Sequence, residues 1–206
     1  MVETTIESPI FDESSGNWLC LDFTHTLDDR YSDHPRELLK SYSDLLAWGQ
    51  YAHVLMDEEA QQLRAEAERR PAEAEAVLQR IITLREALYR MFLAIVEDAA
   101  PEEADLALLN VALAEAMCHA CVMPTGDGFV WDWANKGKAL DVIGWQVVRS
   151  AADLLTSEHL EDVQACAADD CRWLFLDTSK NHSRRWCDMK SCGNREKARR
   201  HYKRKK

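Results

Sequence analysis

Four cysteines near the C-terminus have the residue type and the spacing of a metal site. Cys166 and Cys171 form one C-x4-C pair, and Cys187 and Cys192 form a second pair after fifteen intervening residues. Zinc favours four soft or borderline ligands in a tetrahedron, and two cysteine pairs joined by a hairpin supply them. Because four thiolates close the coordination shell, we predict a structural Zn²⁺ and not a catalytic one. Disulfides or unrelated buried thiols are the alternatives.

No motif in the remaining sequence is typical of an enzyme. The chain has no P-loop, no G-x-G-x-x-G, no H-E-x-x-H and no G-x-S-x-G. We therefore expect a protein that is not an enzyme. Cys118 and Cys121 form a lone CxxC without the second pair that a metal needs, and we interpret both as buried thiols, together with Cys20.

The charges of the chain are divided between two regions. Residues 1–171 carry 12 Lys and Arg against 33 Asp and Glu, a net charge of −21, whereas residues 172–206 carry 13 against 3, a net charge of +10. A polyanion meets this local positive field and not the average charge of the chain. The basic segment therefore predicts binding to DNA. The candidate contact residues are Arg184, Arg185, Lys190, Asn194, Arg195, Lys197, Arg199, Arg200, Lys203 and Arg204.

Two alternatives remain for this basic segment. RNA is one, because Trp186 and Tyr202 offer aromatic faces on which bases could stack. The other is a solubilising end, or an intramolecular partner for the acidic body. Duplex binding that weakens with added salt would favour DNA over the second alternative.

The composition is that of a cytoplasmic globular protein. Hydrophobic residues make up 47% of the chain, with only 7 Gly and 5 Pro, which is enough for a core of more than a hundred residues. The N-terminus does not resemble a secretory signal, and Glu115 interrupts the longest apolar stretch, so we expect no membrane partner. In the cytoplasm, thiols stay reduced and clustered cysteines favour metal over disulfides.

Apolar periodicity predicts a mainly α-helical fold. We expect a multihelical domain over residues 1–160 with a small β hairpin, followed by a treble-clef-like zinc finger over residues 161–206. The hairpin is expected to join residues 120–123 to 128–133 through Gly126-Asp127-Gly128. In the finger we expect paired strands near 173–175 and 184–186, and a helix over 194–205. We expect one further helix that begins at Pro35. Four others are expected over residues 58–70, 72–98, 104–117 and 138–155.

Polar residues interrupt an apolar run near the N-terminus, at residues 16–27. One interpretation is a buried element whose polar side chains cap it. The other is a pocket for a small-molecule effector, with Asp22, His25, Thr26 and Arg30 as candidate ligand-binding residues, although their spacing names no ligand. On the second interpretation the N-terminal domain is a sensor. On the first it is a packing or homodimer-forming domain.

Two segments resemble a known family. Residues 186–197, which contain Cys192-Gly193-Asn194-Arg195, resemble the CGNR zinc finger, and residues 19–27 resemble the opening motif of the ABATE domain. That domain precedes the finger in stress-induced bacterial transcription regulators. The resemblance implies an α-rich N-terminal domain, a C-terminal zinc finger and a bacterial DNA-binding regulator. His25 stands where the opening motif is expected to have Asn.

Overall fold

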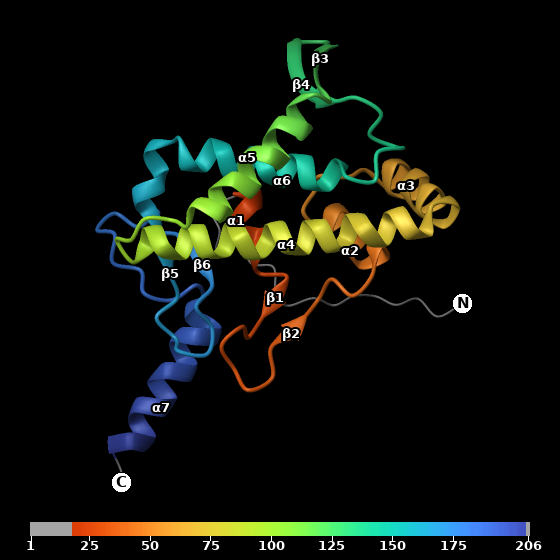
Figure 1. The fold of residues 1–206 in the computed structure, drawn as a ribbon. Coiled ribbons are helices and arrows are strands. Elements are labelled where there is room, and N and C mark those ends of the chain that lie inside the picture. Colours follow the sequence, from red (N-terminus) through yellow and green to blue (C-terminus); the bar gives the residue numbers. More distant parts are fainter. Residues whose placement is uncertain (1–17, 205–206) are drawn as a thin grey trace.

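The computed structural model describes residues 18–204, apart from the side chains of Arg200, Lys203 and Arg204. Helices dominate it, which confirms the mainly α-helical prediction (Figure 1). They are α1 (Leu19–Thr24), α2 (Tyr42–Tyr51), α3 (Asp57–Arg69), α4 (Pro71–Val96), α5 (Glu103–Met117), α6 (Val142–Leu155) and α7 (Asn194–Arg204). None of the helices between residues 18 and 204 combines the length and the apolar character that crossing a membrane requires.

Short strands pair within the described residues as two-stranded antiparallel sheets. These are β1 (Leu27–Asp28) with β2 (Arg36–Glu37), β3 (Ala120–Thr125) with β4 (Gly128–Trp133), and β5 (Val163–Ala165) with β6 (Leu174–Leu176). The β3–β4 hairpin confirms the predicted one, with Thr125 opposite Gly128 around a two-residue turn. Gly128 has a φ of +143°, which only glycine adopts readily. This hairpin stands out from the helical body (Figure 1).

The start of α2 differs from the prediction of a helix beginning at Pro35. Arg36 and Glu37 pair with the chain at residues 27–28 instead, so the backbone stays extended past the proline. The helix begins at Tyr42, where the Ser41 side chain accepts a hydrogen bond from the backbone N–H of Asp44. A serine cap of this kind stabilises a helix start by about 1 kcal/mol. The expected start was therefore too early because the local strand pairing was not recognised.

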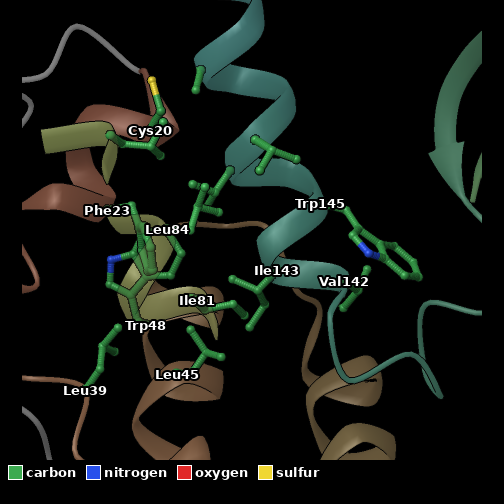
Figure 2. Packing of buried hydrophobic residues seen from close by; sticks show 14 of the residues in the cluster. Cys20, Phe23, Leu39, Leu45, Trp48, Ile81, Leu84, Val142, Ile143 and Trp145 are labelled. Atoms are coloured by element: carbon green, nitrogen blue, oxygen red, sulfur yellow. The ribbon is translucent and has the colours of Figure 1, made fainter. Parts of the chain in front are cut away.

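The main hydrophobic core lies between α1, α2, α4 and α6 (Figure 2). Phe23 of α1 and Trp48 of α2 meet there, with ring centroids 4.8 Å apart. Ile81 of α4 and Ile143 of α6 close the core from the other side. Trp145 lies on the other side of α6 from Phe23 and Trp48 and points toward the β3–β4 hairpin. The core thus fixes α1, and with it the opening motif, against α4.

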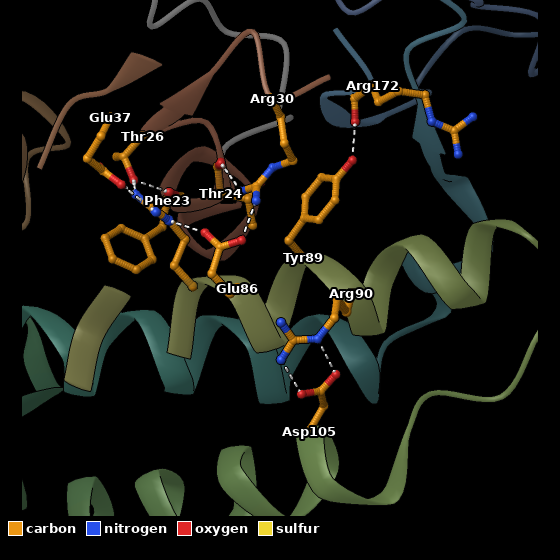
Figure 3. A network of polar contacts seen from close by, with 11 residues as sticks. Phe23, Thr24, Thr26, Arg30, Glu37, Glu86, Tyr89, Arg90, Asp105 and Arg172 are labelled. Atoms are coloured by element: carbon orange, nitrogen blue, oxygen red, sulfur yellow. Dashed lines mark hydrogen bonds and ion pairs between the residues drawn. The ribbon is translucent and has the colours of Figure 1, made fainter. Parts of the chain in front are cut away.

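A buried ionic network holds β2 and the segment after α1 onto α4 (Figure 3). Arg85 of α4 is 2% exposed and donates to both carboxylate oxygens of Glu37, at 2.8 and 2.7 Å. It also donates to Glu86 and to the hydroxyl of Thr26. Arg30 pairs with Glu86 from the other side. A buried guanidinium with this many partners is compensated for its loss of water.

Candidate metal centre

The first cysteine pair lies at the turn of the β5–β6 hairpin. Cys166 directly follows β5, and its backbone N–H donates to the carbonyl of Trp173 at 2.8 Å. The Cys171 N–H donates to the Ala168 carbonyl at 3.0 Å, which closes a tight knuckle. Arg172 then takes a φ of +55° and directs the chain into β6. This geometry turns both sulfurs to the same side of the hairpin.

The second pair lies just before α7. Cys192 belongs to a tight turn at Met189–Gly193, and Cys187 precedes that turn. The Asp188 carboxylate accepts hydrogen bonds from the backbone N–H groups of Lys190 and Ser191, at 3.0 and 2.6 Å. A Cβ atom on Gly193 would lie 2.8 Å from the Met189 sulfur and 3.3 Å from the ring of Trp186. A side chain at this position would therefore displace the end of the Met189 side chain.

The four sulfurs form one compact buried cluster. All four Sγ atoms lie within 4.8 Å of one another, and the separations from Cys187 to Cys171 and to Cys192 are both 3.6 Å. A tetrahedron with Zn–S bonds of ~2.3 Å has edges of about 3.8 Å. A disulfide needs a separation of about 2.05 Å. The cluster therefore fits a tetrahedral ion, and each cysteine is at most 5% exposed, so the site is closed to water.

Ionisation of one thiol in the cluster affects the pKa values of the others. Hydrogen bonds with the other three thiols hold the pKa of Cys166 far below its ordinary value, whereas the thiol of Cys166 beside Cys171 raises the pKa of that group. Four thiols in contact thus cannot all ionise unless a cation lies between them. Arg195 donates to the Cys192 sulfur at 3.4 Å, and the N-terminus of α7 adds partial positive charge. Both stabilise the thiolates of a zinc complex.

Two family models match this chain, one before the β5 strand and one from β5 onward. One, ABATE, described as "Putative stress-induced transcription regulator", matches residues 17–158, which is more than half of the chain. The chain belongs to the ABATE family. A second model, the CGNR zinc finger, matches residues 163–205, and no curated protein matches the chain. The finger model and the sulfur geometry together assign a structural Zn²⁺ to the four cysteines.

The CGNR finger packs directly on the ABATE region through β6. Leu174 and Leu176 point into the main core, whereas Phe175 between them belongs to the small core around the cysteines. His25 donates from Nε2 to the Leu174 carbonyl at 2.7 Å, and its ring stacks on Trp173 with centroids 4.2 Å apart. Tyr89 of α4 donates to the carbonyl of Arg172 (Figure 3). One short strand thus belongs to two hydrophobic cores.

The finger differs from the prediction in one strand. Residues 184–186 were expected to pair with 173–175, but the partner of β6 is β5, and residues 184–186 are not a strand. Asp177 explains the difference, because its carboxylate accepts from the backbone N–H groups of Ser179 and Arg184. These bonds hold the loop in a compact turn. The chain then returns past the knuckle, where the Ala167 N–H donates to the Arg185 carbonyl.

The basic residues predicted to contact DNA fall into three groups. Arg185, Lys190 and Lys197 are exposed, and within residues 18–204 they form no ion pair with any described side chain. The second group has contacts within the finger: Arg184 bonds the carbonyls of Trp186 and Cys187, Asn194 bonds the Lys190 carbonyl, and Arg195 and Arg199 both pair with Asp170. The side chains of Arg200, Lys203 and Arg204 lie outside the described residues.

The residues predicted to bind a small molecule are engaged within the ABATE region itself. His25 and Thr26 are buried, and Thr26 donates to the Phe23 carbonyl and accepts from Arg85. Arg30 pairs with Glu86, and its guanidinium lies 4.0 Å from the centre of the Tyr89 ring. Asp22 is half-buried in α1. The contacts of His25, Thr26 and Arg30 are those expected of a buried element whose polar side chains cap it, and ligand binding at these residues stays a prediction.

Sequence reasoning missed two acidic residues of the finger. Asp170 joins Arg195 and Arg199 of α7 to the knuckle, and Asp177 shapes the loop after β6. Both lie in segments whose sequence predicts only a turn, and no motif spacing identifies them as functional residues. The exposed side chain of Cys118 was also not expected, since both cysteines of the CxxC were predicted to be buried. It lies at the exposed end of α5, where the chain leaves the body for the hairpin.

Proposed function

We propose that this ABATE protein is a DNA-binding transcription regulator whose zinc finger, residues 161–206, presents a basic surface beside residues 1–160. The observation that supports it is that Arg185, Lys190 and Lys197 lie exposed on one small unit of a strongly acidic chain and form no ion pair with any described side chain. Unpaired cations concentrated in this way attract a phosphate backbone. α7 extends away from the helical body, which leaves room for a duplex (Figure 1).

Contacts inside the finger argue against the tail as a partner for the acidic body. Among the described side chains, the acidic residues that form ion pairs with α7 are Asp170 and Glu196, which belong to the finger itself. No ion pair among the described residues joins α7 to the helices of residues 18–158. The pairing with Asp170 instead sets the direction of α7 relative to the zinc cluster. Arg195 and Arg199 are therefore positioning residues in this proposal, and the exposed cations are the phosphate contacts.

The test is duplex binding by the full chain, measured by fluorescence anisotropy over a salt series. Each phosphate contact contributes a slope of about −0.9 to the plot of log affinity against log salt. Lys197→Ala should weaken binding and reduce the slope by about one unit. Lys138→Ala is the matched control, because Lys138 is an exposed lysine on the body. Failure of the intact chain to bind duplex at low salt would refute the proposal, and so would an equal loss in both variants.

RNA is the competing partner, and the same assay separates the two. Trp186 is half-buried beside Gly193 and under Arg185, which leaves it little free face for a base. Tyr202 is 72% exposed and remains available for stacking. We expect duplex DNA to bind more tightly than single-stranded RNA of the same length. The reverse order, with loss on Tyr202→Ala, would favour RNA. Control of binding by a small-molecule effector stays a prediction.

A further inference from the structure

Exposed apolar side chains are concentrated on one part of the body, far from the zinc site. Of the fourteen large hydrophobic residues that are exposed in the described part of the chain, nine lie between residues 106 and 131. They are Leu106, Leu108, Val111, Met117, Val122, Met123, Phe129, Val130 and Trp131. This segment comprises α5 and the β3–β4 hairpin. An apolar surface of this extent marks an interaction site.

Helix α5 is apolar on more sides than its own fold covers. Its fifteen residues include only three charged ones, Glu103, Asp105 and Glu115, yet only Asp105, Leu109 and Ala116 are buried. Val111, near the middle of the helix, is 69% exposed. A helix with apolar residues around its circumference is normally buried in the working protein. A partner therefore has to cover the outer side of α5.

The hairpin presents a second apolar surface. Its register places Val122 opposite Trp131 and Pro124 opposite Phe129, so these four side chains share one face. Phe129 is 77% exposed and Trp131 is 58% exposed. Most of the surface of both rings stays in contact with water in the monomer. Aromatic side chains of this kind are enriched at protein interfaces.

A hollow lies next to this protruding face. A pocket of about 330 Å³ opens between α4, α5 and α6, with Leu108 and Val111 at its α5 wall and Trp145 and Val148 on α6. The pocket and the hairpin face meet at α6. The ring of Trp145 lies 5.9 Å from that of Trp133, and Arg149, next to Val148, lies over Trp131 at 4.6 Å. A projection and a hollow thus lie side by side.

We infer that this surface is the interface of a homodimer. The α5–hairpin face, defined by Leu108, Val111, Val122, Phe129 and Trp131, packs against the same face of a second copy, with each Phe129 entering the pocket of the other. A two-fold interface requires one patch to carry both halves of a complementary pair, and here the projection and the hollow are adjacent. These five side chains are between 36% and 77% exposed, so they can supply a large part of the ~800 Å² that each partner of a stable complex buries.

The charges on this face also fit a second copy better than other occupants. Arg80 and Asp141 at the pocket edge pair with each other at 2.7 Å, and Arg149 lies between Trp131 and Asp153. Glu115 is the third charged residue that lines the pocket, and it forms no ion pair with the side chains that the structure describes. Because Arg80 and Arg149 are both paired with carboxylates, neither is free to bind a phosphate backbone or an anionic lipid surface. Two chains that each carry a net charge of −11 can meet at this place because the face itself is nearly neutral.

The experiment is sedimentation of the full zinc-loaded chain over a range of micromolar concentrations. We expect a dimer for the natural protein. Phe129→Ser should raise the dissociation constant of the dimer about 30-fold or more, since buried aromatic anchors dominate interface energies. Val111→Arg, at the pocket wall, should have the same effect from the other half of the contact. Met56→Ser is the control, because Met56 is 74% exposed but lies outside the face.

The outcomes separate the occupants of this face. A chain that stays monomeric at all these concentrations overturns the inference, as does a dimer that both Phe129→Ser and Val111→Arg leave intact. Far-UV circular dichroism and zinc content, unchanged in all three variants, confirm that any loss is at the interface and not in folding. The inference does not depend on DNA binding, because no nucleic acid enters the assay. A dimer that binds no DNA would refute the proposed function alone.

Discussion

His25 makes the stability of this protein depend on pH in a way that one substitution can isolate. Its imidazole is 1% exposed, donates to the Leu174 carbonyl and stacks on Trp173. Burial disfavours the charged imidazolium and lowers the pKa of His25 to about 4, from 6.5 in an unfolded chain. Between these values the unfolded state binds a proton that the folded state does not. Stability from this group is therefore complete above pH 6.5 and is lost as pH falls toward 4.

The magnitude follows from the difference between the two pKa values. Lowering the pH from 7 to 5 should remove about 2 kcal/mol from the free energy of unfolding through His25 alone. In His25→Gln the amide can still donate to the carbonyl but does not titrate. The variant should be about 1 kcal/mol less stable at pH 7, because it loses the stacked ring. It should lose less stability on acidification.

The assay is urea unfolding followed by circular dichroism at both pH values, for both proteins. Protonation of the cysteine cluster contributes equally to the two proteins and cancels in the difference between them. The account predicts that the stability gap between natural protein and variant changes by about 2 kcal/mol in favour of the variant. A gap that is the same at both pH values within error would refute the reasoning, since it would mean that His25 is protonated equally in both states.

Three further predictions test the packing. Glu37→Gln should cost about 1–3 kcal/mol in urea unfolding, because it leaves the buried Arg85 guanidinium with Glu86 as its one remaining carboxylate partner among the described residues, and an unchanged midpoint would contradict this. Cys187→Ser should lose stoichiometric zinc in a metal assay. It should also lower the unfolding midpoint of the helical body, since Leu174 and Leu176 of the finger belong to the main core. An unchanged unfolding midpoint of the body would contradict the sharing of β6 between the two cores. Gly49→Ala should destabilise the α2 contact measurably, because its Cβ would lie 2.9 Å from Ile143 Cδ1, and a neutral result would show that Ile143 moves freely.

The parts of the fold that followed from the sequence are those with strong local signals. Pro71 at the first position of α4 and the apolar spacing after it predicted a long core helix, and α4 covers Pro71–Val96. Gly126-Asp127-Gly128 predicted the hairpin turn, because glycine and aspartate are typical of tight turns between strands. The cysteine spacing predicted a cluster that the structure forms. In each case a few adjacent residues determine the outcome.

The parts that could not be predicted depend on contacts between distant segments. Nothing near His25 indicates that its partners are Trp173 and Leu174, almost 150 residues away, so a polar residue in an apolar run was equally consistent with a ligand pocket. The pairing of β5 with β6 was missed because three-residue strands carry almost no periodic signal. The division of the basic residues into exposed and paired groups depends on Asp170, which only the folded finger brings to α7.

The central claim is that one zinc ion held by four thiolates fixes the basic helix to the rest of the protein. X-ray absorption at the zinc edge of the purified full chain tests it most directly. The account predicts one zinc per chain with four sulfur neighbours at ~2.3 Å and no oxygen or nitrogen in the first coordination shell. Zinc well below one equivalent, or a shell with fewer than four sulfurs, would contradict it.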